Sequence, residues 1–118
     1  MSYDISLHDP ITKEVIILDK KHQLRGGTYA LDGTDEAWLN ITYNYSNHFK
    51  QMFGEAGIRT IYGMTATESI PLIEEAIKKL GNDINSDYWK STEGNAKFAL
   101  SQLLALAYMA PNGIWDGD

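Results

Sequence analysis

The sequence predicts a single α+β domain that spans residues 1–118, with an N-terminal antiparallel sheet covered by three C-terminal helices. About four short strands are expected in that sheet. Two observations lead to this prediction: apolar and polar residues alternate early in the chain, and from Tyr43 onward apolar residues recur at helical spacing. No internal repeat, low-complexity tract or linker divides the chain, whose length is near the commonest size of one domain.

The first two strands are expected to form a hairpin. Side chains alternate between apolar and polar in the segment 3–7, Asp9-Pro10 then supplies a turn, and an apolar run follows at 15–18. Strands that are close in sequence are usually neighbours in space. We therefore expect 3–7 to pair with 15–18 in antiparallel fashion.

Two further strands are expected at 28–30 and 37–41. The first follows the break at Gly26-Gly27, and the second follows the tight-turn signal Asp32-Gly33. The segment 35–39 is also compatible with a helical turn, so the fourth strand has this alternative.

The first helix is predicted where four apolar residues recur at helical spacing: Tyr45, Phe49, Met52 and Phe53. A glycine at 54 or 57 is expected to end it. The second helix, which ends at Gly81, has two alternative N-caps. If Thr65 is the cap, Pro71 lies beyond the first turn and should kink the helix, whereas a Ser69 cap would place Pro71 in the first turn at little cost.

The third helix is expected to begin near Thr92 and to run to about Met109, before Pro111. Between 98 and 109 only Ser101 and Gln102 are clearly polar. A helix that is apolar on all sides is normally buried, so this one is predicted to be the central core helix. Its apolar surface also suits an interface between two copies of the chain, so a homo-oligomer is one expectation. The turn at 112–113 should then direct the chain end back toward the body.

Charge and composition exclude several classes of partner. The net charge is −6 and only two arginines accompany eight lysines, so no basic track for a nucleic acid polymer is expected. The chain has no cysteine, which excludes disulfides and thiolate chemistry. It shows neither a signal-peptide pattern nor an apolar stretch as long as a membrane span. We therefore expect no membrane partner and a cytoplasmic location, which the resemblance described below would place in a bacterial host.

No catalytic, cofactor or metal motif is complete. Asp83, Asn85 and Asp87 resemble the start of a calcium-binding loop, but Tyr88 and Gly94 occupy the positions that need glycine and a bidentate carboxylate. The three histidines lack the spacing that would place two of them on one metal. We therefore expect a protein that is not an enzyme and that uses no cofactor and no metal.

Aromatic, asparagine and arginine residues gather outside the helical segments and favour a pocket for a small polar aromatic ligand. Such residues offer flat apolar surfaces edged by hydrogen-bonding groups. Aromatic rings would stack on a base, an arginine would face phosphate, and asparagines would bind the polar edges. The candidate ligand-binding residues are Arg25, Tyr43, Asn44, Arg59, Trp89, Asn95 and Trp115.

Arg59 has two alternative roles, because a lone arginine among apolar neighbours must either reach solvent or be paired. It either meets an internal carboxylate, with Asp116, Asp118 and the C-terminal carboxylate as candidates, or binds a ligand phosphate or carboxylate. A protein partner is the second functional hypothesis: an inhibitor or immunity-type protein would present its acidic surface and aromatic anchors to a basic partner.

Five segments together resemble a family of short uncharacterised proteins of bacteria and their phages or prophages. They are 26–29 (GGTY), 39–44 (LNITYN), 57–65 (GIRTIYGMT), 88–97 (YWKSTEGNAK) and 114–118 (IWDGD). The resemblance covers nearly the whole chain and transfers no activity or functional residue. It implies a mobile-element protein, a class whose members often inhibit a host protein or sequester a host signal, such as a nucleotide-derived immune signal.

Overall fold

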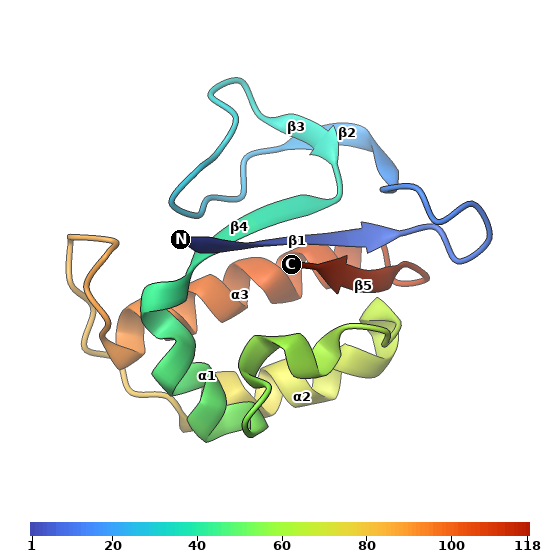
Figure 1. Cartoon of the computed structure of the whole chain (residues 1–118). Helices are drawn as coiled ribbons and strands as arrows, with labels where there is room; N and C mark the ends of the chain where they lie inside the picture. The colour runs from blue at the N-terminus through green and yellow to red at the C-terminus, as the bar shows by residue number, and fades with distance from the viewer.

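The computed structural model describes all 118 residues and contains two antiparallel sheets and three α-helices (Figure 1). The main sheet has the strand order β4-β1-β5, with β1 (Ser2–His8) between β4 (Trp38–Thr42) and β5 (Ile114–Gly117). Both pairings are antiparallel, with Ile5 opposite Leu39 on one side and Gly117 on the other. The α+β class predicted from the sequence is therefore confirmed.

The second sheet corrects the predicted hairpin. It pairs β2 (Ile17–His22) with β3 (Thr34–Glu36) and lies beyond β4, away from α1 and α2 (Figure 1). The expected contact of 3–7 with 15–18 is reduced to an isolated bridge between His8 and Val15. The charged β2 is mostly exposed, whereas β4 is mostly buried. The more apolar strand therefore takes the position beside β1, because burial favours apolar side chains there.

Two other strand predictions also change. The segment 28–30 is not a strand but part of a loop that lies against β4, where Gly26 is too close to the main chain of Asn40 to carry a Cβ. The sequence predicts that the chain returns toward the body after the turn at 112–113 but predicts no strand there, whereas the structure has β5. Its four residues are too few to show alternation, and their pairing with β1 joins the two ends of the sequence in one sheet.

The helices cover one face of the main sheet (Figure 1). They are α1 (Ser46–Phe53), α2 (Ala66–Lys79) and α3 (Glu93–Met109), with short 3-10 turns η1 (Tyr43–Tyr45) and η2 (Gly57–Ile61) on either side of α1. Thr65 and Glu68 form a capping box, so Thr65 is the N-cap of α2 and Pro71 lies inside that helix. Thr92 caps α3, which runs to Met109 as predicted.

The core lies between the main sheet and the helical layer. Its largest member is Trp115, which is 0% exposed and donates its indole N–H to the Ser69 hydroxyl at 2.7 Å. Ile5 and Leu7 of β1 and Leu100 and Leu103 of α3 are also fully buried. Apolar burial of this kind supplies most of the free energy of folding. None of the helices combines the length and the apolar character that crossing a membrane requires.

Candidate functional site

A hollow of about 330 Å³ opens beside η1, α1 and η2, and we call it the tyrosine–arginine hollow. Its lining residues are Tyr3, Tyr43, Ser46, Lys50, Glu55, Ala56 and Arg59. Two glycines return the chain from α1 to η2: Gly54 has φ 98° and Gly57 has φ 59°. Because residues that carry a side chain rarely adopt these φ angles, glycine is favoured at both positions. The reversal brings Arg59 opposite Tyr43.

The guanidinium of Arg59 is held in place by aromatic and polar contacts. It lies 5.1 Å from the ring centre of Tyr3 and 5.5 Å from that of Tyr43. Its Nε donates a hydrogen bond to the main-chain oxygen of Asp118 at 2.8 Å, and Nη2 donates to the Tyr43 hydroxyl at 3.0 Å. A guanidinium carries five N–H donors, so about three remain without a protein partner. The internal partner of Arg59 is thus a main-chain oxygen rather than a carboxylate side chain.

The other polar groups of the hollow also keep hydrogen-bonding capacity. The only ion pair in the molecule joins Lys79 and Glu75, so neither Lys50 nor Arg59 is paired with an aspartate or glutamate side chain. The Lys50 ammonium and the Ser46 hydroxyl have no hydrogen-bond partner in the protein. A hollow with two unpaired cations and one carboxylate, Glu55, is suited to an anion.

Two tyrosines near Arg59, Tyr3 and Tyr62, have a raised pKa that keeps them in their neutral form. Burial raises the pKa of the Tyr3 phenol, and the positive charge of Arg59 opposes part of that rise. Tyr62, whose hydroxyl lies 3.4 Å from the same main-chain oxygen of Asp118, has its pKa raised by burial and lowered in part by Arg59. At neutral pH these phenols are therefore hydrogen-bonding groups and not proton acceptors of the kind a general base provides.

Of the predicted site residues, the structure brings Tyr43 and Arg59 together in this hollow. Ser46, Lys50 and Tyr3 were missed by the sequence analysis. A helical-spacing argument was available for two of them, because Ser46 lies three residues after Tyr43, and Lys50 lies four residues after Ser46, along η1 and α1. Tyr3 comes from β1 and is brought near by the fold, so no local signal pointed to it.

Asn44, in η1, and Asn95, in the first turn of α3, turn their amides to the neighbouring loop 81–92 and hold its main chain. Asn44 donates to the Trp89 carbonyl at 2.8 Å. Asn95 is 7% exposed and makes three bonds: it accepts from the Asn85 N–H at 3.0 Å and donates to the carbonyls of Asp87 and Lys90 at 3.1 and 3.0 Å. The prediction that Asn95 binds ligand edges is corrected, because its amide is already occupied by the loop.

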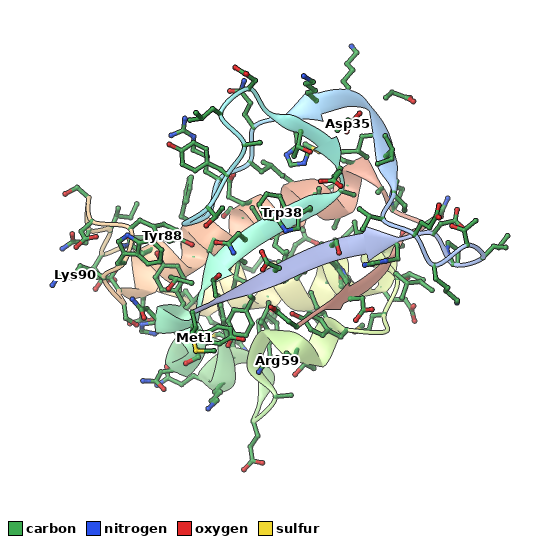
Figure 2. All side chains as sticks on the ribbon, turned by 45° about the horizontal axis from the view of Figure 1, so that its top comes forward. Met1, Asp35, Trp38, Arg59, Tyr88 and Lys90 are labelled. Carbon is green, nitrogen blue, oxygen red and sulfur yellow. The ribbon has the colours of Figure 1, made fainter.

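Trp89 and Arg25 also lie outside the hollow. The Trp89 ring is 51% exposed and contacts Tyr88 edge-on, with 5.0 Å between ring centres. It lies so close to Gly27 that a Cβ there would come within 2.4 Å of it. Arg25 stacks on Tyr29, 4.3 Å from its ring centre. Figure 2 shows Tyr88 and Lys90 well apart from Arg59, so the predicted residues do not converge on a single pocket.

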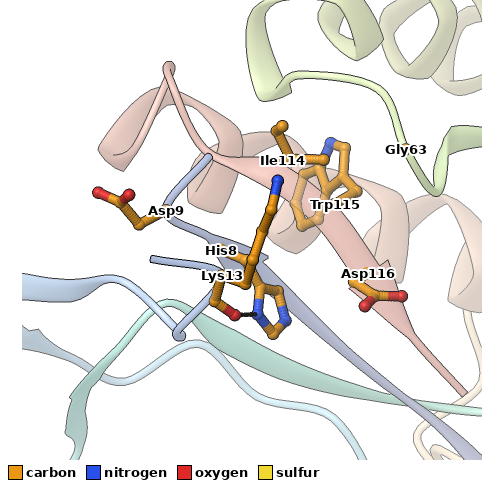
Figure 3. Close-up of a pocket in the computed structure, with 7 residues that line it drawn as sticks. All are labelled: His8, Asp9, Lys13, Gly63, Ile114, Trp115 and Asp116. Carbon is orange, nitrogen blue, oxygen red and sulfur yellow. Dashed lines mark hydrogen bonds between the residues drawn. The ribbon is translucent and has the colours of Figure 1, made fainter. Parts of the chain in front are cut away.

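Trp115 is corrected from a ligand-stacking residue to a core residue. It borders a second hollow of about 270 Å³, which Figure 3 shows with His8, Lys13 and Asp116 around it. The ring nevertheless faces inward and is 0% exposed, because pairing of β5 with β1 places it on the covered face of the sheet. Its polar group is already bonded to Ser69.

A third hollow, of about 350 Å³, lies between the loop 81–92 and α3. It is lined by Tyr45, Ile84, Asn85, Ser86, Tyr88, Asn95 and Phe98, none of which is charged. The hydroxyl of Tyr45 donates to the carbonyl of Tyr88, and the Tyr88 hydroxyl accepts from the N–H of Thr42 at 3.0 Å. Most of its polar groups are thus engaged, which makes it a weaker site for a polar ligand than the tyrosine–arginine hollow.

The three side chains that resemble the start of a calcium-binding loop accept hydrogen bonds from main-chain N–H groups. Asp83 accepts from the N–H of Gly94, Asn85 from that of Asp87, and Asp87 from that of Trp89. No group of three or more acidic, histidine or cysteine residues in the structure could hold a metal ion. Comparison with protein-family models, curated protein sequences and solved structures gives no match.

Proposed function

We propose that this chain is a non-enzymatic binding protein that captures a small anionic ligand with a planar aromatic part in the tyrosine–arginine hollow. The observation that carries the proposal is the convergence of two cations, Lys50 and Arg59, on one hollow of about 330 Å³ whose only carboxylate is Glu55. In a chain with net charge −6, such a local excess of positive charge runs against the overall balance. Two cations gathered at one hollow therefore favour an external anion.

The ligand is held by the two chemistries that the hollow offers. Arg59 and Lys50 bind its anionic group, and the Ser46 hydroxyl supplies a further donor. The half-buried Tyr43 offers the aromatic surface, because Tyr3 is only 5% exposed and is covered. Tethering of the guanidinium to Asp118 and Tyr43 supports this role, since a preorganised donor loses less entropy when a ligand binds.

The biological form of the proposal is sequestration of a nucleotide-derived signal by a protein of mobile-element type. A nucleotide combines a phosphate with a planar base, as the hollow requires. The resemblance to short phage and prophage proteins supplies the context. Capture without turnover would suit the hollow, because burial keeps the Tyr3 phenol neutral and no histidine lines the hollow.

Calorimetry against cyclic nucleotides, 5′-nucleotides and ADP-ribose derivatives tests the proposal. We expect at least one ligand to bind more tightly than about 1 mM, and Arg59→Ala to weaken it roughly tenfold to a hundredfold, the usual loss for a charged hydrogen bond. Arg25→Ala is the matched control, because Arg25 also stacks on a tyrosine but lies outside the hollow. A panel without binders, or equal losses in the two variants, would count against the proposal.

A second function, binding to a protein partner, is favoured by exposed apolar residues around the loop 81–92. Ile84 is 70%, Trp89 51% and Phe98 53% exposed. Three exposed carboxylates and two lysines flank them in the segment 81–97, so the surface is slightly acidic. A basic partner would be retained by the wild type in pull-down from host lysate and lost with Trp89→Ala. Retention that is unchanged by this substitution would exclude the surface.

A further inference from the structure

Resting on the proposed function, we propose that the tyrosine–arginine hollow selects ligands that end in a phosphate monoester over phosphodiesters. The distinction matters because nucleotide signals fall into both classes. Cyclic nucleotides are diesters with one negative charge, whereas a terminal phosphate carries about −1.5 to −2 at pH 7. The hollow itself indicates which of the two it fits.

The first indication is charge. Lys50 and Arg59 give the hollow two cations that form no ion pair with an aspartate or glutamate side chain, against one carboxylate, Glu55. The side chain of Asp118, whose main-chain oxygen binds Arg59, accepts a hydrogen bond from the Asp4 N–H at 2.9 Å. The excess positive charge of the hollow attracts a dianion more strongly than a monoanion.

The second indication is the number of free donors. After its bonds to Asp118 and Tyr43, Arg59 keeps about three N–H groups. Lys50 and Ser46 add free donors, and the Tyr43 hydroxyl, which accepts from Arg59, keeps its own proton for donation. A phosphate monoester has three terminal oxygens to accept these bonds, whereas a diester has two. Arginine binds two such oxygens with its planar fork, which leaves the third for Lys50 and Ser46.

The preference can also be tested by changing the pH, because the titration of the ligand's phosphate can be separated from that of the protein. The titratable groups that line the hollow are Tyr3, Tyr43, Lys50, Glu55 and Arg59, and Tyr62 lies beside them. Groups of these types ordinarily change charge below pH 5 or above pH 9. On α1, His48 is the nearby histidine, and its Nε2 contacts the carbonyl of Ser91, in the loop 81–92.

The test compares matched ligands by calorimetry: the 5′-monophosphate and the 3′,5′-cyclic monophosphate of adenosine and of guanosine. We expect the monophosphate to bind at least tenfold more tightly for the preferred base at pH 7. Lowering the pH to 5 should weaken it roughly fivefold to tenfold, because the second phosphate pKa is near 6, and should leave the cyclic nucleotide unchanged. A pH-dependent change in the protein itself would affect the binding of both ligands.

A variant pair then assigns the preference to the second cation. Lys50→Met should reduce the preference to about twofold, since only Arg59 then remains to balance charge. Lys90→Met, in the loop 81–92, is the control and should keep the full preference. Equal affinity for the monophosphate and the cyclic nucleotide, with Arg59→Ala weakening both, would overturn this inference and leave the proposed function standing. Absence of binding to all four ligands would overturn both.

Discussion

The tyrosine–arginine hollow and the loop 81–92 have the same kinds of residue but use them differently. Both place tyrosine rings beside polar side chains that the sequence analysis assigned to ligand binding. In the loop, Asn95 makes three bonds to main-chain groups and Asn44 makes one. In the hollow, Arg59 makes two bonds and Lys50 is free.

The difference shows that residue type does not distinguish a binding site from a loop that satisfies itself. What distinguishes them is the hydrogen-bonding and charge capacity that remains after the fold has formed. Residues whose groups are occupied should contribute to stability, and residues whose groups are free should contribute to binding. Four predictions test this division, beginning with the largest expected effect.

Replacing Trp115 should cause the largest loss of stability. Trp115→Ala removes the largest fully buried side chain, and substitutions of this kind usually cost about 3–5 kcal/mol in the free energy of unfolding. Urea denaturation followed by circular dichroism measures the loss. Ser69→Ala is the milder companion, because it leaves the indole N–H without its partner and should cost about 1–3 kcal/mol. A loss below about 1 kcal/mol for Trp115→Ala would show that its ring is not part of the core.

Replacing Asn95 should be the next largest effect. Asn95→Ala removes three hydrogen bonds that hold the loop 81–92 and leaves part-buried main-chain groups unpaired, so a loss of about 2–3 kcal/mol is expected. Asn44→Ala, which removes one bond at an exposed residue, should cost less than about 1.5 kcal/mol. Ligand affinity should stay the same in both variants. Reduced affinity without reduced stability would return Asn95 to the binding residues.

The helices and the strand pairing differ in how far they could be predicted from the sequence. The cap at Thr92 and the alternation in β1 are local signals, and they placed the third helix and the first strand correctly. For the second helix the local signals left two caps open, and the structure selects Thr65. Strand pairing is not local. The exclusion of β2 from the main sheet depends on competition with β4 and β5, which are distant in sequence.

The candidate site follows the same rule. Tyr43 and Arg59 could be proposed from their residue types and from their position near glycines. That Trp115 is buried, and that Asn95 is occupied, depends on partners brought by the fold, such as Ser69 for the indole. Tyr3 reaches the hollow from the other end of the chain, so its role could only be found in the structure.

Replacing Arg59 should separate binding from stability. Arg59→Ala removes exposed contacts only, so the free energy of unfolding should fall by less than about 1 kcal/mol. Ligand affinity should nevertheless be lost, because the variant loses its preorganised cation. Parallel urea denaturation and calorimetry on the same sample measure the two effects. A loss of several kcal/mol in stability would mean that Arg59 serves the fold, as Asn95 does.

The titration of the tyrosines should show the smallest effect. Arg59 lowers the pKa of Tyr3 and Tyr62 against the larger effect of burial, so Arg59→Ala should move their ionisation to higher pH. In the other region, burial raises the pKa of Tyr45 and Tyr88, and Arg59 has no part in this. Ultraviolet absorbance of phenolate measures the titration. Unchanged titration curves would contradict the placement of Arg59 beside Tyr3.

The same pKa shifts set the response of the whole protein to alkali. A phenol whose pKa is raised in the folded state stabilises that state fully below the ordinary tyrosine pKa of about 10. This contribution is lost as the pH rises through the raised pKa. We therefore expect thermal stability to fall above pH 10 in the wild type, as measured by a series of melting curves.

Nuclear magnetic resonance of the labelled protein, titrated with a nucleoside 5′-monophosphate, tests the central claim most directly. We expect the amide signals of Tyr43, Ser46, Lys50 and Arg59 to shift together and in a saturable manner, while the signals of 84–98 stay in place. Shifts confined to 84–98, or no saturable shift near Arg59, would contradict the account.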